Sequence, residues 1–168
     1  QVVAPTTPAN YFHVLRRQMH RPFRKPLIVM TPKSLLRHKK CTSFLNDMLP
    51  SNSFHRVLRD QAEAVPGATT VKLADDDKIK RVILCSGKVY FDLMDEREKR
   101  GESRIQILRL EQLYPFPENV LAKELDRFPK AELVWCQEEP QNQGAWNFVR
   151  PLIESTVAKL GGKGGPRY

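Results

Sequence analysis

A serine, a glycine and a lysine stand directly after an apolar, strand-like run. The run is Val82–Cys85, and Ser86, Gly87 and Lys88 separate it from a helical pattern. The backbone N–H groups at the start of a helix are unpaired and, together with the helix dipole, attract anions. We therefore predict an anion-binding site at Ser86 and Lys88. The alternative is a tight strand-to-helix turn in which glycine permits close packing.

Two cations follow another apolar run. Lys33 and Arg37 come after Leu27–Met30, and their spacing places both on one face of a helical turn. Two neighbouring cations can hold a phosphate or a carboxylate through charge-assisted hydrogen bonds. A cationic face that is solvated, or paired with a neighbouring domain, explains the same spacing equally well.

The densest polar cluster of the sequence follows a third apolar run, Leu133–Cys136. Its adjacent carboxylates, Glu138 and Glu139, suggest general acid–base chemistry. Successive side chains on an extended chain point in opposite directions, however, so a structural or interface loop is the favoured interpretation. In that loop the side-chain amides of Asn142 and Gln143 are candidates to bind a base or a pantetheine group.

The other reactive side chains form no recognisable set. Cys41, Cys85 and Cys136 are far apart and include no Cys-x-x-Cys pair, so neither a disulfide framework nor a zinc site is predicted. The glycine-rich stretch 161–165 lacks the Gly-Lys-Ser/Thr sequence of a phosphate-binding loop. The four histidines have no Ser, Cys or carboxylate partner at a recognisable spacing. None of the histidines is favoured as a catalytic base, and we predict no metal site in this chain.

The elements that would position these residues begin with a strand, a helix and a second strand. Gln1–Ala4 is predicted as a strand, and Thr7 followed by Pro8 is typical of a helix start. The apolar run Leu27–Met30 predicts a buried parallel strand. Residues 31–80, interrupted by proline and by an acidic triplet, are predicted to be a long irregular connection with a short strand near Phe54–Leu58.

From Arg81 onward strands and helices alternate. The predicted strands are 82–85, 105–110 and 133–136, and the predicted helices are 88–100, 117–128 and 145–160. This alternation predicts an α/β fold with a mostly parallel, doubly wound sheet.

The 168 residues carry a net charge of +9, and nearly all of the excess lies in the first fifty residues, which hold nine Lys or Arg and one acid, Asp47. Such a segment can contact nucleic acid, anionic lipid, a phosphate-bearing ligand or an acidic protein. Apolar residues interleave with the cations and no zinc-knuckle or RRM signature is present, so we expect no nucleic-acid partner. No apolar run approaches the roughly 18 residues of a membrane span, so we expect no membrane partner.

Five ordered motifs then carry a family resemblance. The sequence closely resembles the carboxyl-terminal part of the thiamine-diphosphate-dependent first component of 2-oxoglutarate dehydrogenase at residues 12–18, 24–38, 85–90, 110–117 and 135–146. The resemblance implies that residues 1–40 end a pyrimidine-binding, transketolase-like domain. It implies that residues 41–80 connect two domains, and that residues 81–168 are a transketolase-type carboxyl-terminal domain, truncated at its end. Because the chain starts at Gln1, we expect a piece of a longer protein.

The resemblance also implies a function for the longer protein. It would decarboxylate 2-oxoglutarate with thiamine diphosphate and magnesium, held by residues absent from this chain, and transfer the succinyl group to a lipoyl group. Its partners would be dihydrolipoyl succinyltransferase and dihydrolipoyl dehydrogenase, and it would be a homodimer in the bacterial cytoplasm or, alternatively, the mitochondrial matrix. The fragment itself would be an inactive structural, dimerisation and regulatory module. The alternatives are a paralogue acting on 2-oxoadipate and a non-catalytic anion- or nucleotide-binding module.

The last expectation concerns an effector such as AMP or acetyl-CoA, to which members of the family respond. The candidate residues all follow predicted strands, whose carboxyl ends meet at one crevice of an open α/β sheet. We expect a nucleotide or acyl-CoA effector to bind there. The candidate residues are Lys33, Arg37, Ser86, Lys88, Asn142 and Gln143.

Overall fold

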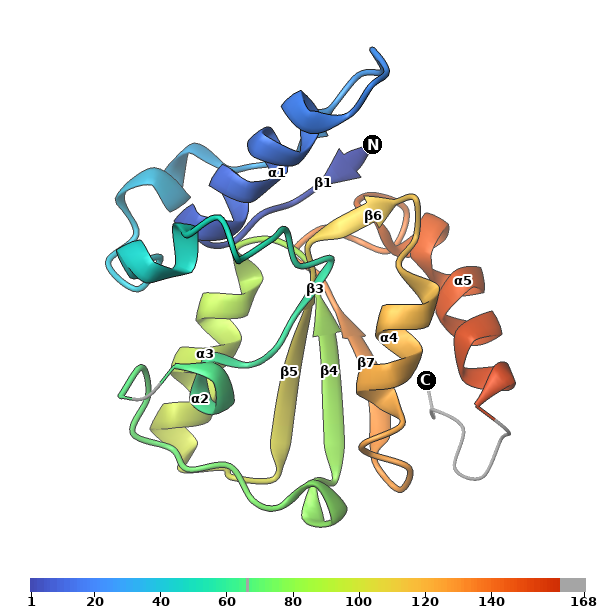
Figure 1. Ribbon diagram of the computed structural model, residues 1–168. Helices are drawn as coiled ribbons and strands as arrows, with labels where there is room; N and C mark the ends of the chain where they lie inside the picture. The colour runs from blue at the N-terminus through green and yellow to red at the C-terminus, as the bar shows by residue number, and fades with distance from the viewer. Residues whose placement is uncertain (66, 161–168) are drawn as a thin grey trace.

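Two sheets of different size organise the computed structural model, which describes residues 1–65 and 67–160. The smaller sheet has the strand order β2-β1-β6 and the larger has the order β3-β5-β4-β7 (Figure 1). The strands are β1 (Val2–Val3), β2 (Ile28–Val29), β3 (Val57–Leu58), β4 (Arg81–Cys85), β5 (Ile105–Leu110), β6 (Gln112–Tyr114) and β7 (Glu132–Cys136). The helices are α1 (Pro8–His20), α2 (Gln61–Ala64), α3 (Val89–Arg100), α4 (Glu118–Leu125) and α5 (Trp146–Lys159), with 3-10 turns η1 (Lys33–Arg37), η2 (Leu45–Met48) and η3 (Asp76–Lys78).

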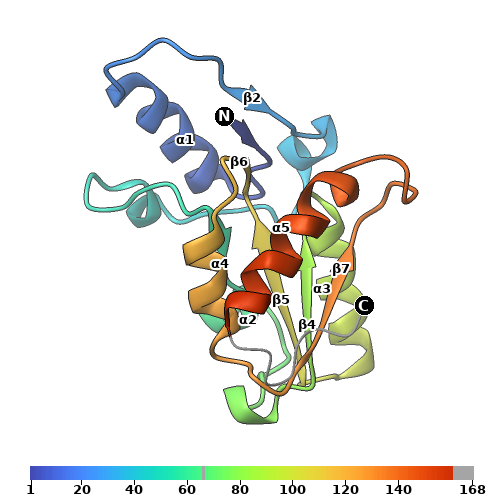
Figure 2. The same cartoon turned by 90° about the vertical axis from the view of Figure 1, so that its right-hand side faces the viewer.

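The larger sheet confirms the doubly wound prediction. Strand β4 pairs in parallel with β5 on one side and with β7 on the other, and β3 closes one edge in antiparallel orientation. Helix α3 covers one face, whereas α4 and α5 cover the other (Figures 1 and 2). Apolar strands with helices on both faces bury side chains on each side, for example Leu84 against α4 and α5 and Ile107 against α3.

The ends of the helices follow the local sequence. Thr7 accepts a hydrogen bond from the Asn10 N–H at the start of α1, and Pro8 occupies the first turn. Gly101 ends α3 in the left-handed conformation with φ +61°, which glycine adopts without strain. Both helix boundaries were predicted from these residues and are confirmed.

Several predicted elements differ in the structure. Strand β2 pairs in parallel with β1 as predicted, but it is not buried: Ile28 is 51% exposed and Met30 57% exposed. Helix α4 is shorter than the predicted 117–128, and β6 was not predicted at all. The short strand in the connection is only Val57–Leu58, and it joins the larger sheet beside β5. The glycine-rich stretch 161–165 and the predicted end of the last domain lie outside the described residues.

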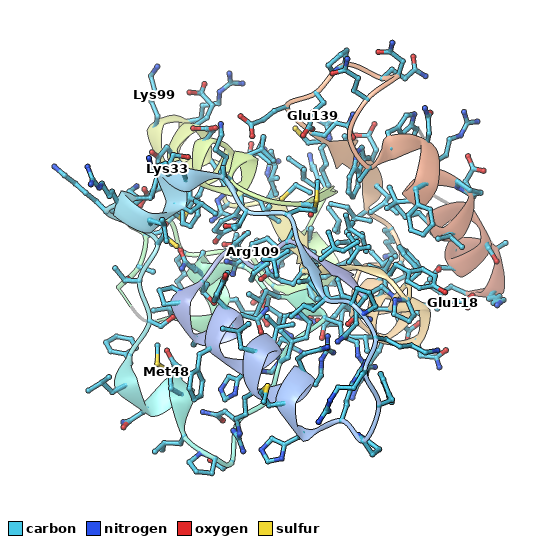
Figure 3. The ribbon with its side chains drawn as sticks, turned by 90° about the horizontal axis from the view of Figure 1, so that it is seen from above. Lys33, Met48, Lys99, Arg109, Glu118 and Glu139 are labelled. Atoms are coloured by element: carbon cyan, nitrogen blue, oxygen red, sulfur yellow. The ribbon has the colours of Figure 1, made fainter. Side chains whose placement is uncertain are left out.

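A buried polar cluster joins the front of the chain to the larger sheet. Glu111, which follows β5, accepts hydrogen bonds from the Thr6 backbone N–H at 2.8 Å, the Thr6 hydroxyl and the Asn10 amide at 2.8 Å. Arg109 of β5 donates to the Thr6 hydroxyl at 3.0 Å and lies over the Tyr90 ring of α3. Figure 3 shows Arg109 in the middle of the molecule. These contacts fix the segment after β1 to the carboxyl end of β5, and the candidate site lies at the carboxyl ends of β4 and β7.

Candidate functional site

A cavity of about 850 Å³ opens between the two sheets. It lies where β4 and β7 end and where α3 and α5 begin, beneath the strands of the smaller sheet. The described residues that line it are Val2, Ala4, Met30, Thr31, Pro32, Ser86, Gly87, Lys88, Leu113, Tyr114, Trp135, Gln137, Glu138, Glu139, Gly144, Ala145 and Phe148. This volume lies in the range of cavities that bind small molecules and cofactors.

The walls of the cavity are mainly apolar and aromatic. The lining residues include Trp135 of β7, Phe148 of α5, Tyr114 of β6 and Met30. The Trp135 ring stacks on that of Trp146, with ring centroids 6.5 Å apart. Large flat side chains of this kind contact aromatic or acyl groups through a broad apolar surface.

The polar rim of the cavity is at the start of α3. Gly87 has φ +78°, so the chain turns there in a conformation that residues with a Cβ rarely adopt. Lys88 follows as the N-cap residue of α3, and its ammonium forms an ion pair with Glu138 from the loop after β7. The hydrogen bond from Lys88 to Glu138 raises the pKa of the Lys88 ammonium, which therefore stays charged at neutral pH.

Gln137 organises the loop on the other side of the rim. Its side-chain oxygen accepts hydrogen bonds from the Trp135 indole at 3.0 Å and from the Trp146 N–H at 3.0 Å. Its amide donates to the carbonyls of residues 139, 140 and 143 at 3.1, 3.2 and 2.9 Å. One side chain thus fixes the course of the loop between β7 and α5. The sequence carried no signal for this role, because only the folded loop brings the three carbonyls together.

The structure brings only some of the predicted residues into the cavity wall. Ser86 and Lys88 line it, although the Ser86 hydroxyl is already committed to the Leu110 carbonyl at 2.9 Å. Asn142 and Gln143 precede Gly144 on the loop and are not among the lining residues.

The first pair of predicted cations lies further away. Lys33 and Arg37 stand on η1, immediately after the lining residue Pro32, but neither lines the cavity. Figure 3 shows Lys33 well to one side of Glu139, which lies on the loop after β7. Of the six candidate residues, Ser86 and Lys88 line the cavity, and the other four do not. The Glu138 carboxylate and the aromatic wall were not predicted as parts of this site.

The cysteines near the cavity are suited to packing. Cys85 of β4 and Cys136 of β7 are register partners on neighbouring strands. Burial raises the pKa of the Cys85 thiol far above its ordinary value and also raises that of Cys136. A protonated thiol is a poor nucleophile and a poor metal ligand. The residues described by the structure include no group of three His, Cys, Asp or Glu side chains that could hold a metal ion.

Among the residues that the structure describes, no helix is long and apolar enough to cross a membrane.

Comparison with known proteins gives the family. Residues 42–167 match the family described as 2-oxoglutarate dehydrogenase C-terminal, and residues 1–39 match the pyrimidine-binding domain of transketolase. The 2-oxoglutarate dehydrogenase E1 component of Brucella anthropi is 59% identical over 163 residues, and that of Brucella ovis is 58% identical over the same length. These matches cover 97% of this chain but only 16% of each relative. The chain therefore belongs to the 2-oxoglutarate dehydrogenase C-terminal family.

Proposed function

We propose that the longer protein to which this chain belongs decarboxylates 2-oxoglutarate and transfers the succinyl group to a lipoyl group. The observation that carries this proposal is the 59% identity to an E1 component over nearly the whole chain. By the same reasoning its partners are a dihydrolipoyl succinyltransferase and a dihydrolipoyl dehydrogenase. The relatives are bacterial, which favours the bacterial cytoplasm over the mitochondrial matrix, and the longer protein would act as a homodimer.

We propose that thiamine diphosphate and its magnesium ion are held by residues of the longer protein that lie outside this chain. Magnesium prefers oxygen ligands, including carboxylates. The described part of the chain contains no group of three His, Cys, Asp or Glu side chains that could hold a metal ion. A ring nitrogen of His13 lies 2.8 Å from the Asp47 carbonyl oxygen, which commits it to a structural contact. No catalytic step is assigned to the described residues.

Steady-state kinetics of the full-length protein test the reaction. The rate with 2-oxoglutarate should exceed the rate with 2-oxoadipate, measured as kcat/KM in the presence of thiamine diphosphate and magnesium. A clear preference for 2-oxoadipate would instead assign the protein to the longer acid.

For this chain itself we propose a regulatory role, in which the cavity binds an effector that combines an anionic group with an aromatic or acyl body. The supporting observation is the combination of apolar walls with the single ammonium of Lys88 at the rim, where helix α3 begins. An adenine nucleotide or an acyl-CoA has this chemistry. Lys33, Arg37, Asn142 and Gln143 border this region in the sequence and would contact a ligand that extends beyond the cavity.

Titration calorimetry with AMP and with acetyl-CoA tests the regulatory role. Charge-assisted hydrogen bonds contribute about 1.5–3 kcal/mol, so Lys88→Ala should weaken binding about tenfold or more. Arg37→Ala should weaken the binding of a ligand that extends beyond the cavity. Catalysis by the full-length protein should persist in both variants. Unchanged affinity in both variants would leave these cations with a structural role only.

A further inference from the structure

The charges around the cavity do not match an anionic ligand. Among the described residues that line it, Lys88 is the one cation, whereas Glu138 and Glu139 are both acids. The rim thus carries more negative than positive charge when all three groups are ionised. An incoming anion would meet an ammonium that the Glu138 carboxylate already occupies.

The ion pair at the rim joins two separate elements. Lys88 begins α3 and Glu138 follows β7, fifty positions later in the sequence. The Lys88 side chain is 38% exposed and that of Glu138 is 40% exposed, so both have room to rotate into solvent. The backbone around Glu138 is fixed by Gln137, and the carboxylate can therefore leave the ammonium without a change in the course of the loop.

We propose that Glu138 is a built-in competitor for the anion-binding ammonium of this cavity. In the ligand-free protein its carboxylate occupies Lys88, and an anionic effector binds by displacing it. This inference rests on the regulatory role proposed above and adds the way in which that site is controlled. The effector's anion replaces the Glu138 carboxylate at Lys88, while its apolar body gains contacts with Trp135 and Phe148.

If Glu138 competes with the effector, removing its charge should increase the affinity for the effector. An ion pair this exposed contributes little to stability, so its removal should change ligand affinity by a modest factor. Glu138→Gln should tighten the binding of AMP and of acetyl-CoA about two- to fivefold, whereas most substitutions in a binding site weaken it. Glu139→Gln is the matched control, because its carboxylate lines the same rim but lies against Gly144 rather than on Lys88. It should change affinity less than twofold.

Salt dependence and a double variant separate competition from a general loss of negative charge. In the wild-type protein one carboxylate–ammonium contact is replaced by another, so affinity should depend weakly on ionic strength. In Glu138→Gln a new ion pair forms, and affinity should fall more steeply with added salt. In a Lys88→Ala background, Glu138→Gln should have little effect on ligand affinity, because the cation for which the carboxylate and the ligand compete is absent.

Calorimetric titration of the full-length protein with AMP and with acetyl-CoA decides the question. Tighter binding in Glu138→Gln, with a steeper salt dependence and with Lys88 present, is the expected result. Wild-type binding with unchanged or weaker affinity in Glu138→Gln would overturn the competition and leave the proposed effector site in place. An absence of binding in the wild type and in both glutamine variants would overturn the effector site itself, and the competition with it.

Discussion

Thr6 and Glu111 lie 105 positions apart in the sequence and are joined by two hydrogen bonds. The Glu111 carboxylate accepts from the Thr6 backbone N–H at 2.8 Å and from the Thr6 hydroxyl, and all of these atoms are buried. Desolvation raises the pKa of Glu111, while the nearby Arg109 and the hydrogen bonds from Thr6 and Asn10 oppose that rise. This contact secures the front segment, and with it one wall of the cavity, to the larger sheet.

Loss of the Glu111 carboxylate should therefore destabilise the chain strongly. Glu111→Ala leaves the buried Thr6 N–H without an acceptor and removes one of the two acceptors of the Asn10 amide, and it removes the negative charge beside Arg109. We expect a decrease of about 3–5 kcal/mol in the free energy of unfolding, measured by urea denaturation. Glu111→Gln retains an acceptor oxygen and should lose clearly less. Equal losses in the two variants would contradict this account.

The pair of Arg97 and Asp60 provides a second stability test. Asp60 is fully buried and accepts hydrogen bonds from Arg97 Nη2 at 2.9 Å and from the Ile107 N–H at 3.0 Å. Arg97→Met leaves this carboxylate buried without its cation and should cost about 3–5 kcal/mol in the free energy of unfolding. Arg100→Met is the control on the same helix. Its pair with Glu96 is exposed, so it should cost less than about 1 kcal/mol, and a comparable loss in both variants would contradict the prediction.

Stability should also depend on pH through Glu98. The Thr70 N–H, which donates at 2.7 Å, and Lys40 lower the pKa of Glu98 from an ordinary 4.5 to about 2. A lowered carboxyl pKa stabilises the fold above pH 4.5, and this contribution is lost as the pH falls toward 2. Glu98→Gln should lower the free energy of unfolding by about 1–2 kcal/mol at pH 7, and the difference from the wild type should shrink below pH 4.5.

The matched control for Glu98 is Asp92→Asn, on the same helix. The Asp92 side chain has no ion pair among the described residues, and its replacement should change stability by less than about 1 kcal/mol at pH 7. Guanidinium denaturation of the three proteins from pH 3 to pH 7 measures both effects. A difference between Glu98→Gln and the wild type that stays constant over this range would contradict the assignment.

Gln137 should be required for the shape of the cavity. Gln137→Ala removes the two hydrogen bonds that its oxygen accepts and the three that its amide donates, so the loop after β7 loses its fixed course. We expect a change in tryptophan fluorescence, because the Trp135 indole and the Trp146 backbone N–H both donate to this oxygen and the Trp146 ring stacks on that of Trp135. Effector binding should weaken about tenfold. Asn142→Ala, on the same loop, should leave the fluorescence unchanged. Unaltered fluorescence in Gln137→Ala would contradict the role given to this side chain.

Local sequence patterns were sufficient to predict the elements that carry their own signals. Thr7 and Pro8 start α1, and Gly101 ends α3, because capping depends on residues next to the helix end. The apolar runs at β4 and β7 predicted parallel strands because both faces of the sheet are covered by helices. The same reasoning was wrong about burial at β2, where Ile28 lies at an edge of the smaller sheet.

The candidate site was only partly predictable, because its walls come from distant segments. Ser86 and Lys88 could be recognised, since the strand-to-helix turn that holds them is continuous in the sequence. The pairing of Lys88 with Glu138 depends on the register of β4 against β7, and no sequence pattern predicts that register. The buried contacts of Arg109 and Glu111 were likewise not predictable, because only the folded chain brings Thr6 against these two residues.

The central claim, that the cavity at the ends of β4 and β7 binds an anionic effector, is tested most directly by a crystal structure determined with AMP or acetyl-CoA at saturating concentration. The account predicts electron density for the ligand inside the cavity, with its anionic group about 3 Å from Lys88 Nζ and its flat or acyl portion against Trp135 and Phe148. Glu138 should be turned away from Lys88 in that structure. Ligand density at another site, with this cavity empty and the pair of Lys88 and Glu138 intact, would contradict the account.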